Sequence, residues 1–341
     1  MGGVCSGMDC EFSFLALCLL LIMDKDLAYY VHCFTHLKRD NKNGGAPHKP
    51  ILLLSIIRLF ESGVFKSNEI SISPDLVSAF KSSWTKLVIT THHPIFALPF
   101  YHMRSEPFWQ LIAAPGCEMW IESKGTMRTF GNLKTAVEFA RIDQELTELL
   151  TQPETRNVLK VSVLDKYFKE TKSNYGDFNA EGLPDSSILY ESSEEYKRKI
   201  VELKKRVDEN TFQEEVFIRS GLFKREIPKI YDNTCAISGL RIDATSNISM
   251  VDACHIVPFS EGYDDTLVNG ISLCPTLHRA FDRGLIALSG KYEVLINHNF
   301  VENSSVYNLS QFAGKEIFLP DNSKYYPAAE NLRNYRRRFG F

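Results

Sequence analysis

The chain has 341 residues, of which 44% are hydrophobic, so it can bury a core and form about two domains. Its formal net charge is −3, so nucleic-acid binding would depend on local basic patches rather than on the overall charge. The eight cysteines are scattered and form no CxxC pair. This argues against a disulfide framework and a four-cysteine zinc ribbon, and indicates a reducing, cytoplasmic location.

The apolar stretch FSFLALCLLLIM at 12–23 is too short to span a bilayer as a helix. Asp9 and Glu11 precede it, no Lys or Arg does, and no A-x-A cleavage site follows, unlike in a signal peptide. We expect residues 1–22 to be a doubtful extension: either sequence upstream of a true start at Met23 or a buried segment. No other stretch is a membrane candidate, and we expect no membrane partner.

The first half of the chain predicts a mainly helical domain over 23–170. The segment PILLLSIIRLFESG at 50–63 predicts a buried helix, because Pro50 suits a first helical turn and Gly63 follows the last apolar turn. The segment CEMWIES at 117–123 is interpreted as a strand. Residues 128–168 predict further helices with a break at Pro153.

Residues 171–222 are interpreted as a linker followed by a helix. The stretch 171–192 is polar and contains Gly and Pro, whereas 192–235 has helical periodicity with Ser192 or Ser193 as its cap. The many lysines and arginines there suit either a solvated helix face or contacts with phosphate. A second domain over 223–341 then contains short strand-like pieces and a basic tail at 331–339.

Polar residues in this second domain form a pattern typical of catalysis. His255 lies in CHIVP, Asn269 lies in VNGISL fourteen residues later, and His278 lies in LHRAFDRG after nine more. Asp282 follows His278 by four residues, so both share one face of a helix. A lone His255 would be a packed core residue, but this set, with Asp252 or Cys254, could hold a divalent metal beside a base.

The pattern resembles the HNH endonucleases, the ββα-metal nucleases, over about residues 223–341. The resemblance implies that His255 is the general base, that Asn269 orders the loop between two strands, and that the carbonyl of the preceding hairpin orients the base. It also implies that His278 and Asp282, with Asp252 as a third ligand, bind Mg²⁺ or Mn²⁺. Many family members place a metal-binding His or Asp before the base; here Cys254 occupies that position, and we interpret it as a small buried hydrophobe.

These residue types suit phosphodiester hydrolysis. The reaction needs a nucleophilic water, a group to deprotonate that water, and positive charge near the phosphate and the leaving oxygen. Imidazole is the side chain whose ordinary titration lies nearest to neutral pH, so a histidine base is suitable.

Two segments of the first domain carry basic and aromatic residues together. In NGGAPHKPILLL (43–54), His48 and Lys49 precede the buried helix, where backbone amides favour anions. The second segment, HPIFALPFYHMRSEPFWQL (93–111), suits either a nucleic-acid surface or an ordinary strand with aromatics facing the core.

The pair of segments resembles the sulfur-binding domain of McrA-type restriction enzymes over about residues 25–165. That family joins this domain to a C-terminal HNH nuclease and recognises DNA with a phosphorothioate backbone, whose sulfur suits an apolar pocket. Pro99 matches the family's pocket proline, whereas Leu98 replaces a common tyrosine. The resemblance implies a DNA contact set of His48, Lys49, Pro99, Phe100, His102 and Arg104.

The sequence therefore predicts an α+β protein: a mixed, mainly helical DNA-reading domain and a C-terminal ββα-metal nuclease domain. We expect a restriction endonuclease for double-stranded, backbone-modified DNA, and a homodimer because both strands must be cut. Two alternatives remain open: an HNH nuclease acting on methylated or unmodified DNA, and a DNA-binding protein whose nuclease has decayed.

Overall fold

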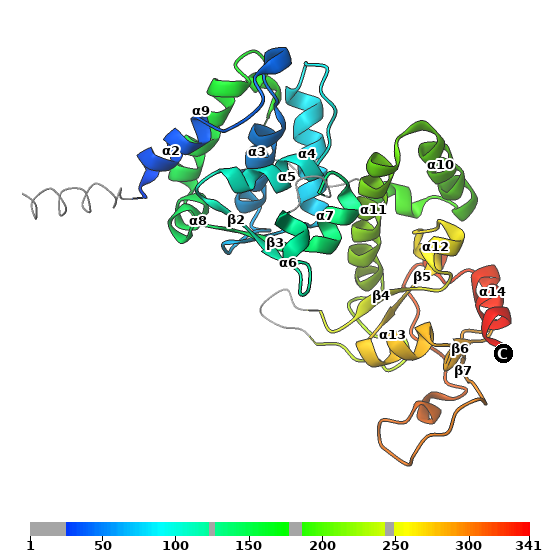
Figure 1. Cartoon of the computed structure of the whole chain (residues 1–341). Coiled ribbons are helices and arrows are strands. Elements are labelled where there is room, and N and C mark those ends of the chain that lie inside the picture. Colours follow the sequence, from blue (N-terminus) through cyan, green and yellow to red (C-terminus); the bar gives the residue numbers. More distant parts are fainter. Residues whose placement is uncertain (1–24, 123–126, 177–185, 243–248) are drawn as a thin grey trace, which may run out of the picture. The chain divides into compact units, whose positions relative to one another are not determined.

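The computed structural model describes residues 25–122, 127–176, 186–242 and 249–341. The described chain mixes helices with short strands, an α+β architecture, and divides into two compact units (Figure 1). The first unit comprises residues 1–72 and 76–182, and the second comprises residues 73–75 and 183–341. The expected extension at 1–22 lies outside the described residues. No helix in the described ranges is long and apolar enough to cross a membrane.

Helix α3 (His48–Glu61) forms the centre of the first unit, which confirms the helix predicted from its apolar sequence. Every residue from Lys49 to Phe60 is buried. The helix contacts α5, α8 and α9, and α2 packs against α9 (Figure 1). The helices of this unit are α2 (Leu27–Thr35), α4 (Pro74–Leu87), α5 (Ala97–His102), α6 (Glu118–Glu122), α7 (Phe130–Ala136), α8 (Gln144–Thr151) and α9 (Pro153–Tyr167).

A three-stranded antiparallel sheet of order β1-β3-β2 completes this unit. Its strands are β1 (Glu69–Ser71), β2 (Trp109–Ala113) and β3 (Val137–Ile142). Strand β3 lies inside the segment predicted to form helices; Val137, Ala140 and Ile142 are buried, and the strand pairs on both edges.

The strand predicted at 117–123 is wrong, because residues 118–122 form the short helix α6. Its first turn closes when the amide of Trp120 donates to the carbonyl of Cys117. Met119 and Trp120 are exposed and belong to a helix, so the apolar residues of this segment do not indicate a buried strand.

Helices α10 (Ser193–Arg206) and α11 (Glu209–Ile230) belong to the core of the second unit. The Ser192 hydroxyl accepts a hydrogen bond from the Glu195 amide at 3.3 Å, which confirms the predicted cap. Tyr196, Phe212 and Phe223 pack into one hydrophobic cluster with the residues that follow. The expected domain boundary at residue 223 falls inside α11, and all of α11 and α10 belongs to the second unit.

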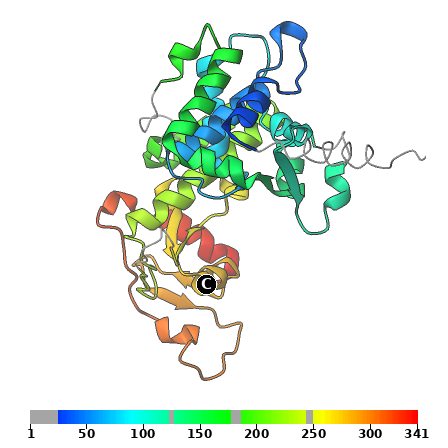
Figure 2. The ribbon, with the colours of Figure 1, turned by 90° about the vertical axis from the view of Figure 1, so that its left-hand side faces the viewer.

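The second unit is built around a hairpin followed by a helix. Strands β4 (Asp252–His255) and β5 (Gly270–Leu273) pair antiparallel, with His255 opposite Gly270, and α13 (Pro275–Asp282) follows directly. A second hairpin, β6 (Ile286–Leu288) with β7 (Val294–Ile296), comes next, so the predicted short strands are confirmed. Helix α14 (Ala329–Phe339), red in Figure 2, packs against β6.

Candidate functional site

The alternation of strand β4 sends neighbouring side chains to opposite faces of the hairpin. Asp252 and Cys254 face helix α13, whose His278 and Asp282 lie beside them. His255, the last residue of β4, faces helix α11 instead. Consecutive residues of one strand thus contribute to two adjacent polar groups.

The ring of His255 is fixed by stacking and by a hydrogen bond. It lies on the ring of Phe223 with centroids 3.9 Å apart and planes 7° apart. Its Nε2 lies 2.7 Å from Oδ1 of Asp265. Because a carboxylate only accepts, Nε2 donates to Asp265, and in the neutral imidazole the lone pair then lies on Nδ1. Among the described residues Nδ1 has no hydrogen-bond partner, and the side chain keeps 22% of its surface exposed.

Asp265 is the polar residue that sequence reasoning missed. Its side chain is 1% exposed, and its Oδ2 accepts a hydrogen bond from the Tyr196 hydroxyl at 3.2 Å. Burial and the charge of Asp265 raise the pKa of Tyr196, so the phenol stays protonated as a donor. A side-chain carboxylate, rather than the expected backbone carbonyl, therefore orients His255. The adjacent acids at 264 and 265 were the available signal, since buried acids need partners.

The stacking on Phe223 depends on a glycine opposite His255. A Cβ at Gly270 would lie 2.2 Å from Cδ1 of Ile227 and 2.9 Å from the ring of Phe223. Only the absence of a side chain lets α11 approach the hairpin this closely. Gly270 therefore contributes to the position of the His255 ring by letting Phe223 approach it.

Asn269 ties together the loop that follows His255. Its Oδ1 accepts from the Val257 amide at 2.9 Å, and its Nδ2 donates to the carbonyls of Val257 (2.8 Å) and Asp264 (2.9 Å). The Asp264 carboxylate in turn accepts from the Ser193 hydroxyl on α10 at 2.7 Å. Asn269 is fully buried, so these bonds fix the loop rather than contact a substrate.

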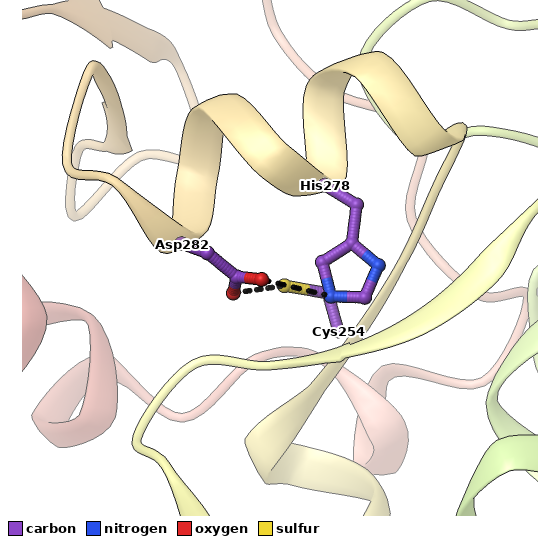
Figure 3. A group of neighbouring side chains, drawn as sticks. All are labelled: Cys254, His278 and Asp282. Atoms are coloured by element: carbon purple, nitrogen blue, oxygen red, sulfur yellow. Dashed lines mark hydrogen bonds and ion pairs between the residues drawn. The ribbon is translucent and has the colours of Figure 1, made fainter. Parts of the chain in front are cut away.

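On the other face, Cys254, His278 and Asp282 form a group whose candidate ligand atoms lie within 4.8 Å of one another (Figure 3). Nε2 of His278 is 3.4 Å from Oδ2 of Asp282, and Sγ of Cys254 is 3.8 Å from Oδ1 of Asp282. Asp252 is outside this group: its Oδ2 lies 3.8 Å from the other ring nitrogen of His278, Nδ1. Burial, followed by the charge of Asp282, raises the pKa of the Cys254 thiol.

In the first unit, a pocket of about 790 Å³ brings together five of the six residues expected to contact DNA. Two other basic residues, Lys38 and Arg39, and one acid, Asp40, also line it. Ala46, Leu98 and Pro99 supply apolar lining. The five expected residues in the pocket are His48, Lys49, Pro99, His102 and Arg104.

The sixth expected residue, Phe100, is fully buried and does not line this pocket; its ring packs edge-on against Trp109, at 5.2 Å between centroids. Lys49 lines the pocket, but its amine is 2.5 Å from the Glu106 carboxylate and 2.8 Å from the Ser105 hydroxyl. Its charge is therefore already balanced inside the protein.

Two arginines of the pocket keep a charge without a carboxylate partner in the described part of the chain. Arg104 donates to the Ile121 carbonyl at 2.6 Å and lies over the Tyr101 ring at 4.2 Å. Arg39 donates to the Ala46 carbonyl at 3.3 Å and lies over the Tyr167 ring. Carbonyl and ring contacts orient a guanidinium but do not neutralise it, so the pocket suits an anion.

Comparison with known proteins finds a family match inside the second unit. Residues 235–289 match the family model of the HNH endonucleases, so this unit carries an HNH endonuclease domain. No curated protein matches the chain. Among solved structures, a modification-dependent TagI restriction endonuclease is similar over 36% of this chain, with 19% identity and a TM-score of 0.28. That similarity spans 39% of the TagI chain, well under two thirds of its length.

Proposed function

We propose that this protein is a metal-dependent restriction endonuclease that recognises backbone-modified DNA and hydrolyses its phosphodiester bonds. One observation carries the nuclease half of the proposal: His255, oriented by a buried carboxylate, directly follows a residue of the Cys254–His278–Asp282 group. Both lie within the segment that matches the HNH endonucleases.

In this mechanism His255 takes the proton from the attacking water at Nδ1. Asp265 holds the opposite nitrogen, stabilises the imidazolium that forms, and keeps the ring in one tautomer. Phe223 prevents the ring from tilting, and Asn269 fixes the loop through which Asp265 is connected to β4. The protein thus supplies a positioned base before any substrate binds.

The donor set of the other group fits a divalent cation. Imidazole, carboxylate and thiol are all metal-binding groups, and their candidate atoms already converge. His278 and Asp282 would hold the ion, with Cys254 beside them. The ion would supply positive charge at the scissile phosphate and the departing oxygen.

The first unit would read the modification through its pocket. Arg39 and Arg104 offer positive charge to a backbone phosphate, and Leu98 and Pro99 offer apolar contacts beside it. A phosphorothioate sulfur is larger and less well hydrated than oxygen, so an apolar contact favours it where a hydrogen-bond donor would favour oxygen. This combination supports the phosphorothioate specificity expected from the sequence. Cutting both strands would take two copies of the nuclease site, which supports a homodimer.

The test incubates the purified chain with matched duplexes, with and without a phosphorothioate, in separate Mg²⁺, Mn²⁺, Co²⁺ and Zn²⁺ buffers. A His255→Ala variant is the control. Cleavage of only the sulfur-containing duplex, lost in the variant, is the expected result. Cleavage of both duplexes would retain the nuclease and reject the sulfur specificity. Binding of the modified duplex without cleavage in any metal would indicate a decayed nuclease.

A further inference from the structure

We propose that Cys254 is a metal ligand of the nuclease site, and that the site therefore selects a thiophilic divalent cation such as Zn²⁺ or Co²⁺ over Mg²⁺. The inference rests on the proposed nuclease function and specifies its cofactor. It replaces the expectation that Cys254 is only a small buried hydrophobe and that Asp252 completes the ligand set.

The spacing of the three side chains supports tetrahedral coordination. Metal bonds of about 2.1 Å to nitrogen or oxygen and about 2.3 Å to sulfur place the ligand atoms of a tetrahedron roughly 3.5 Å apart. The Nε2–Oδ2 distance of 3.4 Å between His278 and Asp282 is close to that value. The Sγ of Cys254 lies 3.8 Å from the other oxygen of Asp282, Oδ1, and the three candidate atoms lie within 4.8 Å of one another, so side-chain rotations would bring them to tetrahedral spacing.

The burial of the three ligands leaves one side of the group accessible. Cys254 is fully buried, whereas the side chains of His278 and Asp282 are 25% and 59% exposed. Three protein ligands with an accessible fourth position are the arrangement of catalytic zinc sites, where water or substrate takes the open place. On binding, the Cys254 thiol loses its proton to solvent as the sulfur–metal bond forms.

Asp252 has a different place in this arrangement. It lies on the Nδ1 side of His278, so it favours the tautomer with the proton on Nδ1 and the lone pair on Nε2. Nε2 is the nitrogen that faces Asp282. An acid on the far side of a ligating imidazole orients the ring and strengthens its binding.

Ligand chemistry then determines the choice of metal. Mg²⁺ requires octahedral coordination by oxygen, but within the described residues the group offers one carboxylate, one imidazole and one thiol. Sulfur and nitrogen donors favour Zn²⁺ and Co²⁺, with Mn²⁺ weaker. We expect Mg²⁺ to bind weakest of the four.

Cobalt spectroscopy tests the proposal without measuring cleavage. Co²⁺ added to the full chain should give a thiolate-to-cobalt charge-transfer band in the near ultraviolet that saturates at one ion per chain. Cys254→Ser should abolish this band and raise the dissociation constant for Co²⁺ by more than about 100-fold, since loss of a supporting residue alone costs about 10- to 100-fold.

The matched control is the double variant Cys235→Ser/Cys274→Ser. These two thiols share a hydrogen bond, which lowers the pKa of Cys235, so they form the rival sulfur site in this unit. The band should persist in the double variant. A band that is lost there and retained in Cys254→Ser would overturn the proposal.

X-ray absorption of the Zn²⁺-loaded wild-type chain provides a second measurement that needs no variant. One sulfur neighbour at about 2.3 Å, with the remaining neighbours nitrogen or oxygen, is expected. Zero or two sulfur neighbours would contradict the ligand set. Neither measurement depends on cleavage. If the protein binds Zn²⁺ through one sulfur but cuts no DNA, the proposed nuclease function is rejected and the proposed metal site is retained.

Discussion

The charged groups around His255 and those in the pocket of the first unit are held in opposite ways. Asp265 is buried and pairs with both His255 and Tyr196, so each of its oxygens has a defined partner. Arg39 and Arg104 are held by carbonyl oxygens and aromatic rings, and neither has a carboxylate partner in the described ranges. The first arrangement fixes the orientation of one imidazole ring, whereas the second keeps positive charge available to an incoming anion.

The two arrangements should respond differently to substitution. A network that fixes one atom fails sharply when a member is removed, because a buried partner is left unsatisfied. A set of charges that acts on a phosphate should lose affinity in small, nearly equal steps.

The largest effect is expected from His255→Ala. Removing the base should lower the cleavage rate by about 10²- to 10⁴-fold while leaving DNA affinity unchanged, because the residue acts on water and not on the duplex. Single-turnover cleavage and equilibrium binding are to be measured on the same preparation. His298→Ala, which removes an exposed histidine of the same unit, should retain full activity. Equal rates in the two variants would exclude His255 as the base.

Asp265→Asn should be the next most damaging change. It keeps the shape of the side chain but allows the other imidazole tautomer, and we expect a rate loss of at least about 10-fold, with about 10⁴-fold as the upper limit. Nitrogen-15 NMR should show the His255 proton leaving Nε2, which a merely structural role would not produce. Asp321→Asn, at an exposed acid, is the control. An unchanged tautomer together with an unchanged rate would refute the positioning role.

Gly270→Ala tests whether the stability of the second unit depends on the close approach of α11 to the hairpin. The new Cβ would collide with Ile227 and Phe223, so we expect a loss of about 1–3 kcal/mol in the free energy of unfolding. Gly290→Ala is the matched control, since nothing lies within 4 Å of its Cβ position. Denaturant unfolding of the two variants gives the difference in the free energy of unfolding. Equal stabilities would show that the hairpin and α11 can move apart without loss of stability.

Sequence patterns predicted local features of this protein better than they predicted long-range contacts. The buried helix at 50–63, the Ser192 cap and the face shared by His278 and Asp282 follow from periodicity and spacing. Strand β3 was missed because its pairing with strands on both edges overrides the helical propensity of the surrounding sequence. Asp265 was missed because the fold alone brings it together with His255, ten residues away, and with Tyr196, 69 residues away in the sequence.

Arg104→Ala should weaken DNA binding modestly and without the sharp failure expected at Asp265. Loss of one phosphate contact should reduce the slope of log affinity against log salt by about 1, with little change in the cleavage rate of bound DNA. The slope is measured by titrating DNA binding with salt for both Arg104→Ala and the control variant Arg141→Ala. Arg141 is a suitable control because it pairs with Glu69 on the sheet. An unchanged slope would remove Arg104 from the proposed DNA contact set.

The smallest effect is expected from the protonation of His102. Burial, and then the positive charges of Lys49, Arg104 and Arg128, lower the pKa of His102 below the ordinary 6.5, so the free protein holds this ring neutral at neutral pH. A bound phosphate favours the charged ring and raises its pKa. DNA affinity should therefore increase as the pH falls through the pKa in the complex, and level off below the pKa of the free protein.

His102→Gln should remove most of this pH dependence while leaving the affinity at alkaline pH unchanged, because the ring is neutral there. Each unit of difference between the two pKa values corresponds to about a tenfold gain, so a gain of a few-fold is expected. His48, whose pKa is also lowered by burial, can leave a smaller residual slope. DNA-binding isotherms of the wild-type protein and of His102→Gln, measured across pH, give the two pH profiles. Identical pH profiles would mean that His102 does not face the phosphate, and that the lysine and arginine side chains provide the charge of the pocket.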